Sequence, residues 1–475
     1  MQNDDKKQTV NRRDFLRKAG AIGLAGFAGT KALNAVADTN KERVITAPDQ
    51  PNPPIITQNF PIAGNDDRPI VQYPEKRPLI RVTSRPPQLE TPMNMLADAE
   101  GCEGALTAND AFFVRYHNSV IPLSIDPNTH TLSIQVQLDG SAYIQPDYKT
   151  GSPEGGSPTK TVLTLTMKDL QTKFEDFSIV AVNQCSGNSR GFENPRMPGG
   201  QLGNGTVGCA RWTGVRLKDV LAMAGIDSTA QQVIFNGLDN PDDEPPDFVK
   251  AIPYSKAING EVMLAYAMNG EELPMLNGYP LKLIVPGWFG TYHVKHLSEI
   301  IISYSNDMSG MFYMGSAYRI PNNGTGYIAP GTSWPPATGA PTPPWIPINR
   351  LKIRSFITSH LEGAKVHTGR PVRVKGIAFD GGDGIKMVEF SSDGGLTWAE
   401  AKLGKDFGKY AFRPWTIRFT PPADGAYVLQ VRATSNTNET QPADPAMCWN
   451  PNGYMRNVIE TVNVTAVSTL GDSDD

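Results

Sequence analysis

Proline and glycine occur along the whole of this chain and constrain its fold more than any other feature. The 475 residues include 45 glycines and 40 prolines, and both residue types interrupt helices and strands. This composition argues against a long helical bundle or a coiled coil and predicts an α+β fold with many turns. Prolines are dense in residues 326–349, where we expect a semi-rigid linker between two folded bodies.

The body before the linker, residues 91–325, contains short apolar patterns of both kinds. Residues 132–138 alternate as a half-buried strand should, and residues 178–182 form the continuous apolar run of a buried strand. Residues 216–225 have helical spacing and end at a glycine. Residues 38–90 are polar and rich in proline, so we expect an extended arm that lies on the main body.

The body after the linker, residues 350–468, has a different character. Residues 372–379 and 426–433 are strand-like, and an Asp-Gly-Gly turn signal lies between them at 393–395. Short strands at this spacing over ~100 residues predict an immunoglobulin-like β-sandwich. Residues 469–475 form a short acidic tail.

Residues 1–37 have the features of an export signal. The pair Arg12-Arg13 is followed by Phe-Leu, by an apolar Gly/Ala-rich stretch at 19–28 and by Ala-Val-Ala at 35–37. This order resembles the twin-arginine signal, although an ordinary signal peptide or a disordered basic arm shares some of its features. The apolar stretch is far shorter than the ~20 residues of a spanning helix. We therefore expect a protein that is exported folded to the periplasm and does not span the membrane.

Net charge and missing motifs narrow the classes of function. The formal net charge of −4 argues against a nucleic-acid-binding protein, which normally has a basic face. The sequence has no Walker A, HExxH or CxxC motif, and no GxGxxG follows a predicted strand. Because CxxCH is also missing, we expect no covalently attached c-type haem on this chain.

Cys185 lies where a reactive thiolate would be placed. It comes directly after the predicted buried strand, in a loop of Ser, Gly and Asn residues that also holds Arg190. A neighbouring cation and free backbone N–H groups lower the pKa of a thiol, and thiolates bind soft metals. A buried structural cysteine would fit the same pattern equally well.

The segments around Cys185 resemble the molybdenum-cofactor domain of the sulfite oxidase family, and most of all the catalytic subunits of bacterial periplasmic sulfite dehydrogenases. The resemblance rests first on residues 184–190, 199–202 and 210–215. Further matches follow in the family's order across residues 90–465, at 112–117, 235–239, 264–274, 278–287, 293–295, 316–321, 390–398 and 449–457.

The resemblance implies a molybdopterin-binding catalytic domain at 91–325 and a dimerisation-type domain at 350–468. It also implies one molybdenum and one molybdopterin, with Cys185 as the single protein ligand to the metal. The family's catalytic residues fall on Arg115, His117, Tyr318 and Arg456. Its cofactor contacts fall on Phe113, Arg115, His117, Cys185, Asp239, His293, Val294 and Lys295.

The activity that the resemblance implies is the oxidation of sulfite to sulfate by oxygen-atom transfer at the molybdenum centre. Arg115 and Arg456 would bind the substrate anion through their guanidinium groups. Electrons would pass singly to a c-type cytochrome, and the chain would form a homodimer or a heterodimer with a cytochrome subunit. Competing interpretations are a sulfur dehydrogenase subunit, a methionine-sulfoxide-type reductase of the same fold, or a non-catalytic secreted binding protein.

Two positions depart from the family pattern, because Asn277 and Lys282 stand where vertebrate sulfite oxidases have histidine and arginine. The contacts to the pterin phosphate are therefore expected to differ in detail. The other cysteines, Cys102, Cys209 and Cys448, have no role in the resemblance. They permit at most one intramolecular disulfide.

Overall fold

The computed structural model of this chain describes most of the residues that follow its N-terminal region. The described residues are 55–60, 64–97, 104–146, 156–241 and 246–469. The chain divides into two compact units, 1–44 and 45–475, and all of the first lies outside the described residues. The predicted signal at 1–37, Cys102 and nearly all of the predicted acidic tail lie outside them too.

A five-stranded antiparallel sheet begins the described chain, with strand order β1-β2-β3-β4-β5. Its members are β1 (Ile55–Phe60), β2 (Gly64–Val71), β3 (Leu79–Thr83), β4 (Gln88–Glu90) and β5 (Val114–Arg115). The arm predicted at 38–90 is thus built largely of paired strands where it is described, and not of unpaired extended chain. Phe60 packs edge-to-face on Phe192, so this sheet contacts the loop that follows Cys185.

A second five-stranded sheet carries much of the core of the first body, in the order β11-β10-β15-β6-β7. Its strands are β6 (Thr131–Gln137), β7 (Thr159–Thr166), β10 (Gln232–Gly237), β11 (Lys250–Pro253) and β15 (Leu297–Ser303). β6 and β15 run parallel, and the other neighbours run antiparallel. Leu132 and Ile134 are fully buried on one face of β6, which confirms the strand predicted at 132–138.

A third sheet, in the order β13-β12-β9-β8 with β14 also paired to β12, leads to the cysteine loop. Its strands are β8 (Phe177–Gln184), β9 (Val207–Arg216), β12 (Met263–Met268), β13 (Glu271–Glu272) and β14 (Lys282–Ile284). Residues 180–184 of β8 are all buried, as expected of a continuous apolar run that is covered on both faces. The predicted buried strand is therefore confirmed, and Cys185 is the first residue beyond it.

The helices of the described residues are short, as the glycine and proline content predicts. They are α2 (Met167–Lys173), α3 (Leu217–Met223) and α4 (Tyr254–Ala257), and none is long and apolar enough to cross a membrane. α3 confirms the predicted helix at 216–225. Shorter turns are η2 (Met93–Met95), η4 (Arg190–Phe192), η5 (Met275–Asn277), η6 (Gly290–Tyr292), η7 (Phe312–Ser316) and η8 (Pro445–Cys448).

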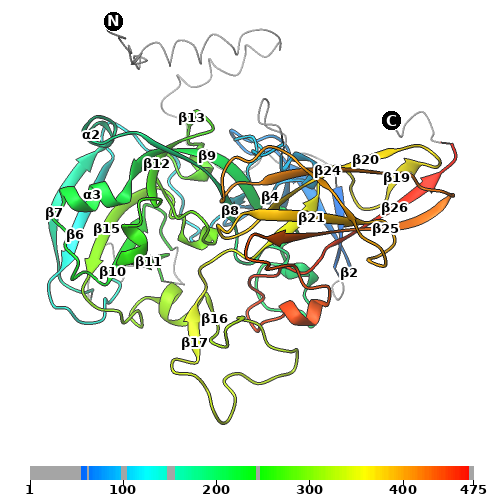
Figure 1. The fold of residues 1–475 in the computed structure, drawn as a ribbon. Helices are drawn as coiled ribbons and strands as arrows, with labels where there is room; N and C mark the ends of the chain where they lie inside the picture. The colour runs from blue at the N-terminus through cyan, green and yellow to red at the C-terminus, as the bar shows by residue number, and fades with distance from the viewer. Residues whose placement is uncertain (1–54, 61–63, 98–103, 147–155, 242–245, 470–475) are drawn as a thin grey trace, which may run out of the picture. The chain divides into compact units, whose positions relative to one another are not determined.

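The proline-rich segment is more ordered than predicted. Strand β17 (Trp345–Pro347) lies inside the predicted linker and pairs antiparallel with β16 (Arg319–Pro321), so the expectation of a linker without strands was wrong at its C-terminal end (Figure 1). Pro321 ends β16 and Pro347 ends β17, so each lies at an end of this two-stranded ladder. The missing N–H group of proline is tolerated there.

Two sheets form the C-terminal body and enclose one core, in the orders β18-β20-β24-β23 and β19-β26-β25-β21-β22 (Figure 1). The strands are β18 (Arg354–Ile357), β19 (Ala364–His367), β20 (Val372–Phe379), β21 (Ile385–Ser391), β22 (Ala399–Glu400), β23 (Lys402–Leu403), β24 (Arg413–Phe419), β25 (Gly425–Ser435) and β26 (Thr461–Val467). This arrangement is a β-sandwich, and its immunoglobulin-like topology stays a prediction. Val182 and Cys209 share a core cluster with Phe356 and Phe379, so the strands beside the cysteine loop pack directly on the C-terminal sheets.

Candidate active site

One cavity collects almost all of the side chains that the sequence singled out. Its lining includes Phe113, Arg115, His117, Cys185, Asp239, His293, Val294, Lys295 and Tyr318. These residues come from β5 and the segment after it, from the loop after β8, from the end of β10, and from the segments after η6 and η7. We call this space the active-site cavity.

Backbone hydrogen bonds in the loop after β8 hold Cys185 just beyond the end of that strand. The Cys185 N–H donates to the Thr206 carbonyl at 2.9 Å, and the Asn188 N–H donates back to the Cys185 carbonyl at 3.0 Å. The Asn188 side chain accepts from both the N–H and the hydroxyl of Thr206, at 3.0 and 2.6 Å. The thiol is half-buried, so it is positioned by the backbone while still facing the cavity.

Arg115, His117 and Tyr318 form a hydrogen-bonded row along one wall. Arg115 Nη2 lies 3.3 Å from His117 Nε2, and the Tyr318 hydroxyl is hydrogen-bonded to the same nitrogen. Burial lowers the pKa of His117 well below its usual value, and the charges of Arg115 and Lys250 lower it further. In a neutral imidazole with Nε2 as the acceptor, one lone pair faces both Arg115 and Tyr318. Burial also raises the pKa of Tyr318 and keeps its phenol protonated.

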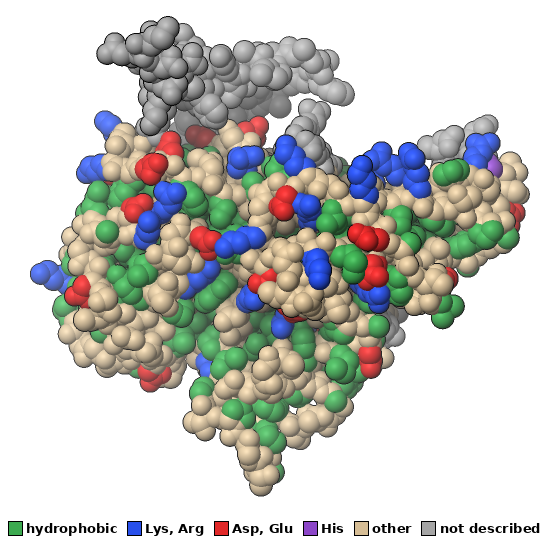
Figure 2. All heavy atoms as spheres, viewed as in Figure 1, with side chains coloured by type: hydrophobic (Ala, Val, Ile, Leu, Met, Phe, Trp, Pro, Cys, Tyr) green, Lys and Arg blue, Asp and Glu red, His purple; other side chains and the backbone are tan. Residues whose placement is uncertain are grey.

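The opposite wall is strongly cationic. Lys295 Nζ donates to the Arg115 carbonyl at 2.5 Å and lies 3.4 Å from the centre of the Tyr116 ring. Burial lowers the pKa of Lys282 to about 7, with a further contribution from Lys76. Burial raises the pKa of Asp239 to about 7, against the influence of Lys295. On the face drawn in Figure 2, basic and acidic side chains are interspersed.

Several polar atoms in the cavity wall are buried and have no hydrogen-bond partner within the described chain. They are Asn183 Oδ1, Ser186 Oγ, Thr291 Oγ1 and His293 Nδ1. His293 Nε2 donates to the Val285 carbonyl at 3.0 Å, which leaves Nδ1 as an acceptor, and burial lowers its pKa to about 3. Buried polar groups are normally satisfied, so this group of unsatisfied atoms indicates a polar ligand.

The two departures from the family pattern also line the cavity. Asn277 accepts a hydrogen bond from Lys76 Nζ at 2.5 Å and donates to the Phe113 carbonyl at 3.0 Å. Lys282 Nζ lies 4.7 Å from the centre of the Trp212 ring. Lys282 is thus a basic side chain where vertebrate sulfite oxidases have arginine, whereas Asn277 braces the segment that holds Phe113.

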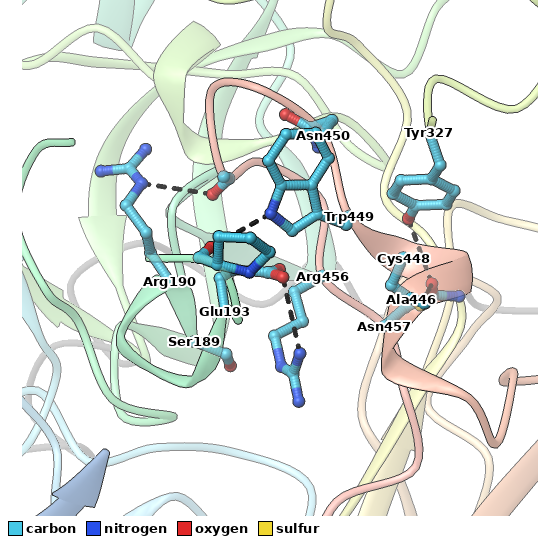
Figure 3. Close-up of polar contacts among 12 residues, drawn as sticks. Ser189, Arg190, Glu193, Tyr327, Ala446, Cys448, Trp449, Asn450, Arg456 and Asn457 are labelled. Carbon is cyan, nitrogen blue, oxygen red and sulfur yellow. Dashed lines mark hydrogen bonds and ion pairs between the residues drawn. The ribbon is translucent and has the colours of Figure 1, made fainter. Parts of the chain in front are cut away.

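Arg456 is not brought to the cavity, so the structure does not support its predicted contact with substrate. It points instead toward Glu193, with 3.7 Å between Nη1 and the Glu193 carboxylate (Figure 3). Its Nε lies 3.3 Å from Glu460 Oε1. The physical reason is charge pairing, because a buried guanidinium between two carboxylates is held away from any other anion.

Arg190, which no prediction assigned to the site, lies close behind the cavity wall. It lies five residues after Cys185, and its Nε donates to the Gly453 carbonyl at 3.2 Å. Its guanidinium lies 5.1 Å from the centre of the Tyr454 ring. Tyr454 stacks in turn on Tyr318 at 5.3 Å. Arg190 therefore lies behind Tyr454, which packs on Tyr318.

Three glycines make room for the Arg190 side chain. A Cβ atom on Gly187 or Gly199 would lie 2.8 or 2.9 Å from the guanidinium, and one on Gly453 would lie 2.9 Å from Arg190 Cγ. Because such contacts are too short for real Cβ atoms, each position needs glycine while Arg190 keeps this place. The glycines of the loop were the available signal, but the sequence alone did not connect them with Gly453.

The two other described cysteines, Cys209 and Cys448, are both buried and each takes part in a hydrogen bond. Cys209 Sγ accepts from the Phe412 N–H at 3.4 Å, and the Cys448 thiol donates to Asn457 Oδ1 at 3.2 Å. A disulfide between these two residues is therefore not formed.

Family models match both bodies of the chain. Residues 155–311 match the oxidoreductase molybdopterin binding domain, and residues 346–467 match the Mo-co oxidoreductase dimerisation domain. The fold and the matched domains define the chain as a molybdopterin oxidoreductase.

Known proteins narrow the class. The mitochondrial sulfite oxidase of Mus musculus is 32% identical over 413 residues, which is 84% of this chain and 68% of that protein. The NAD(P)H nitrate reductase of Hordeum vulgare is 30% identical over 331 residues, which is 66% of this chain and 36% of that protein. The crystal structure of the sulfane dehydrogenase SoxCD from Paracoccus pantotrophus has the same fold, with a TM-score of 0.58 over 80% of this chain and 84% of that chain at 23% identity. The chain belongs to the sulfite oxidase family.

The active-site cavity fits the molybdopterin that this membership implies. The unsatisfied atoms of Ser186, Thr291 and His293 can hydrogen-bond a polar heterocycle, and they all face one space. Lys282 and Lys295 supply positive charge for a phosphate group. Cys185 supplies the soft thiolate ligand that a molybdenum centre requires.

Proposed function

We propose that this protein oxidises sulfite to sulfate, with molybdenum held by molybdopterin and by the Cys185 thiolate. The observation that carries the proposal is the meeting of Cys185, Arg115 and Tyr318 in one cavity that also contains unsatisfied polar atoms. The bound cofactor would supply the two-electron oxygen-atom transfer, and the protein would supply binding, orientation and electrostatics.

The side chains of the cavity wall divide the remaining work. Arg115 is the nearest guanidinium to His117 and Tyr318 and would bind the sulfite anion. Neutral His117 accepts the Tyr318 hydrogen bond and so holds the phenol in place before substrate binds. The phenol has one hydroxyl proton, so Tyr318 would release His117 when it donates this hydrogen bond to the reacting oxygen. Arg190 adds positive charge from behind Tyr454 and would strengthen anion binding.

We further propose export and partnership for this chain. The twin-arginine pattern at 1–37 favours export of the folded, cofactor-loaded protein to the periplasm. Electrons would leave singly to a c-type cytochrome. The dimerisation-domain match at 346–467 supports a dimer, either of two copies of this chain or with a cytochrome subunit.

Sulfite-dependent reduction of cytochrome c by the purified protein tests the proposal, together with its molybdenum and pterin content. We expect activity in the wild type and its loss in Cys185→Ala. Cys448→Ser, a control at a buried cysteine outside the cavity lining, should stay active. An inactive but molybdenum-loaded wild type, or a fully active Cys185→Ala, would overturn the proposal.

The same preparation separates the competing functions. Reduction of a sulfoxide by the wild type, without sulfite oxidation, would assign a methionine-sulfoxide-type reductase. Activity only on carrier-bound sulfur with a haem partner would assign a sulfur dehydrogenase subunit. Absence of molybdenum and pterin from protein made in a molybdenum-replete host would assign a non-catalytic binding protein.

A further inference from the structure

Three buried charged side chains and one that is partly buried join the cysteine loop to the C-terminal sheets. Glu193 follows η4 in the loop, Arg354 begins β18, and Arg456 and Glu460 lie shortly before β26. Arg456 lies between Glu193 at 3.7 Å and Glu460 at 3.3 Å, and Arg354 pairs with Glu460 at 2.8 Å. We name these four residues the charge clamp.

Burial makes the pairing within the charge clamp obligatory. The side chains of Glu193 and Arg354 are each 1% exposed, and that of Arg456 is 6% exposed. A buried charge is costly unless it is paired, and removing one partner strands the other. Burial raises the pKa of Glu193 to about 7, although Arg456 acts against this shift. Arg456 thus opposes the protonation of Glu193 that burial favours, and loss of either side chain would leave the other buried without this partner.

The charge clamp grips both ends of η4, the turn that carries Arg190. At its start, Arg354 Nη1 donates to Ser189 Oγ at 2.9 Å, and at its end Glu193 faces Arg456. Ser189 has a φ of +70°, a left-handed conformation that a non-glycine residue adopts only when its surroundings hold it there. Two arginines of the C-terminal sheets thus fix the turn between them.

The chain segment just before the charge clamp's Arg456 also reaches the catalytic wall. The Met455 N–H donates to the Ser186 carbonyl at 3.0 Å, next to Cys185. The Gly453 carbonyl accepts from Arg190. The Tyr454 ring lies 5.1 Å from the Arg190 guanidinium and 5.3 Å from the Tyr318 ring. A shift of Arg456 would therefore move the contacts that hold Arg190 and the Tyr318 wall.

We propose that the charge clamp is a positioning device through which the C-terminal sheets set the place of Arg190 and hence the affinity of the site for its anion. Arg456 acts through Arg190 and does not touch substrate. The inference rests on the proposed sulfite oxidation only for the identity of the anion. It makes the docking of the C-terminal sheets on the loop a condition for tight substrate binding.

Variants of Arg456 test this role. Arg456→Met removes the charge and keeps the aliphatic stem, and Arg456→Lys keeps the charge. Arg432→Met is the matched control, because Arg432 pairs with Glu389 at 2.7 Å between β21 and β25 and does not line the cavity. If Arg456→Met does not fold, Glu193→Gln tests the same pair from the loop side.

We expect Arg456→Met to raise the KM for sulfite and the inhibition constant for sulfate about tenfold, with kcat and molybdenum content within about twofold of wild type. Amide hydrogen exchange should speed up over residues 186–193. Arg456→Lys should recover most of the affinity, because the contact with Glu193 at 3.7 Å is an ion pair rather than a hydrogen bond. Arg432→Met should change none of these values.

Unchanged KM and exchange in both Arg456→Met and Glu193→Gln would overturn the inference. A parallel fall of kcat and molybdenum content, without faster exchange in the loop, would do the same. If the wild type does not oxidise sulfite, the proposed function fails, whereas hydrogen exchange and sulfate binding still decide the role of the charge clamp.

Discussion

The active-site cavity and the charge clamp both bury cations, but they balance them differently. In the charge clamp, Arg354 and Arg456 each contact a glutamate. In the cavity, no ion pair joins Lys282 to a carboxylate within the described residues, and burial lowers its pKa to about 7. Paired cations therefore mark a structural joint, and cations without a carboxylate mark a place for an anionic ligand.

Breaking the charge clamp should cost more stability than any change in the cavity wall. Arg354→Met leaves Glu460 with only its 3.3 Å contact to Arg456 and removes a hydrogen bond to Ser189, and losing one partner of a buried pair costs about 3 kcal/mol. We expect a fall of that size in the free energy of unfolding, measured by chemical denaturation. Arg432→Met, at a more exposed pair, should cost less than about 1 kcal/mol. Equal losses of unfolding free energy in Arg354→Met and Arg432→Met would contradict the distinction between the charge clamp and an ordinary, more exposed ion pair.

Acid should lower the free energy of unfolding through the buried histidines of the body that contains the cavity. His296 is fully buried between the Tyr116 hydroxyl and the Tyr279 carbonyl, and burial lowers its pKa to about 3. The unfolded chain takes up this proton near pH 6.5 and the folded protein does not, so stability is lost as pH falls below 6.5. We expect His296 to account for about 2 kcal/mol of the loss between pH 7 and pH 5.

Denaturation curves of wild type and His296→Gln at the two pH values measure this contribution. The variant should have a flatter dependence on pH, whatever its stability at pH 7. His367→Gln, in a strand of the C-terminal sheets, should keep the wild-type slope. An unchanged slope in His296→Gln would show that other groups carry the acid response.

Removing a cavity cation should cost cofactor rather than stability. Lys282→Met should reduce the molybdenum and pterin content of the purified protein about tenfold, because the charge facing the cofactor is lost. The free energy of unfolding of the cofactor-free protein should not fall, since the variant no longer buries a desolvated ammonium group. Lys256→Met, at a part-buried lysine outside the cavity lining, is the control and should keep its cofactor.

The smallest effect is expected at Tyr318. Tyr318→Phe removes the hydroxyl that donates a hydrogen bond to His117 and keeps the ring that stacks on Tyr454. We expect kcat to fall about fivefold, or about 1 kcal/mol of transition-state stabilisation, with little change in KM. Steady-state kinetics with sulfite and cytochrome c give both values, and a rise in KM alone would assign Tyr318 to substrate binding.

Local patterns predicted the parts of the fold that local sequence controls. The apolar run at 178–182 corresponds to β8, the helical spacing at 216–225 corresponds to α3, and the position of Cys185 directly after a buried strand followed from the first pattern. β17 was missed because it pairs only with β16, in a two-stranded ladder with prolines at its ends. The proline-rich composition of this segment indicates only a linker. Short-range rules do not distinguish that pairing from unpaired chain.

The sequence predicted those parts of the site whose residues lie within one motif. Residues within one motif, such as Arg115 with His117, or Cys185 with its loop, met in the cavity as expected. The places of Arg190 and Arg456 were not predicted, because their surroundings come from distant segments. Arg190 contacts Gly453 across 263 residues of sequence, and Arg456 meets Glu193 from the other end of the chain. Charge pairing of this kind is a property of the folded interior.

The three glycines around Arg190 have a consequence for the way related sequences are sorted. Gly187 and Gly199 belong to the cysteine loop, whereas Gly453 belongs to the C-terminal segment, and a side chain at any of them would collide with the arginine. A sequence that carries a larger residue at one of these positions must therefore place its arginine elsewhere or do without it. Taken together, the three positions separate the chains that can house this arginine from those that cannot.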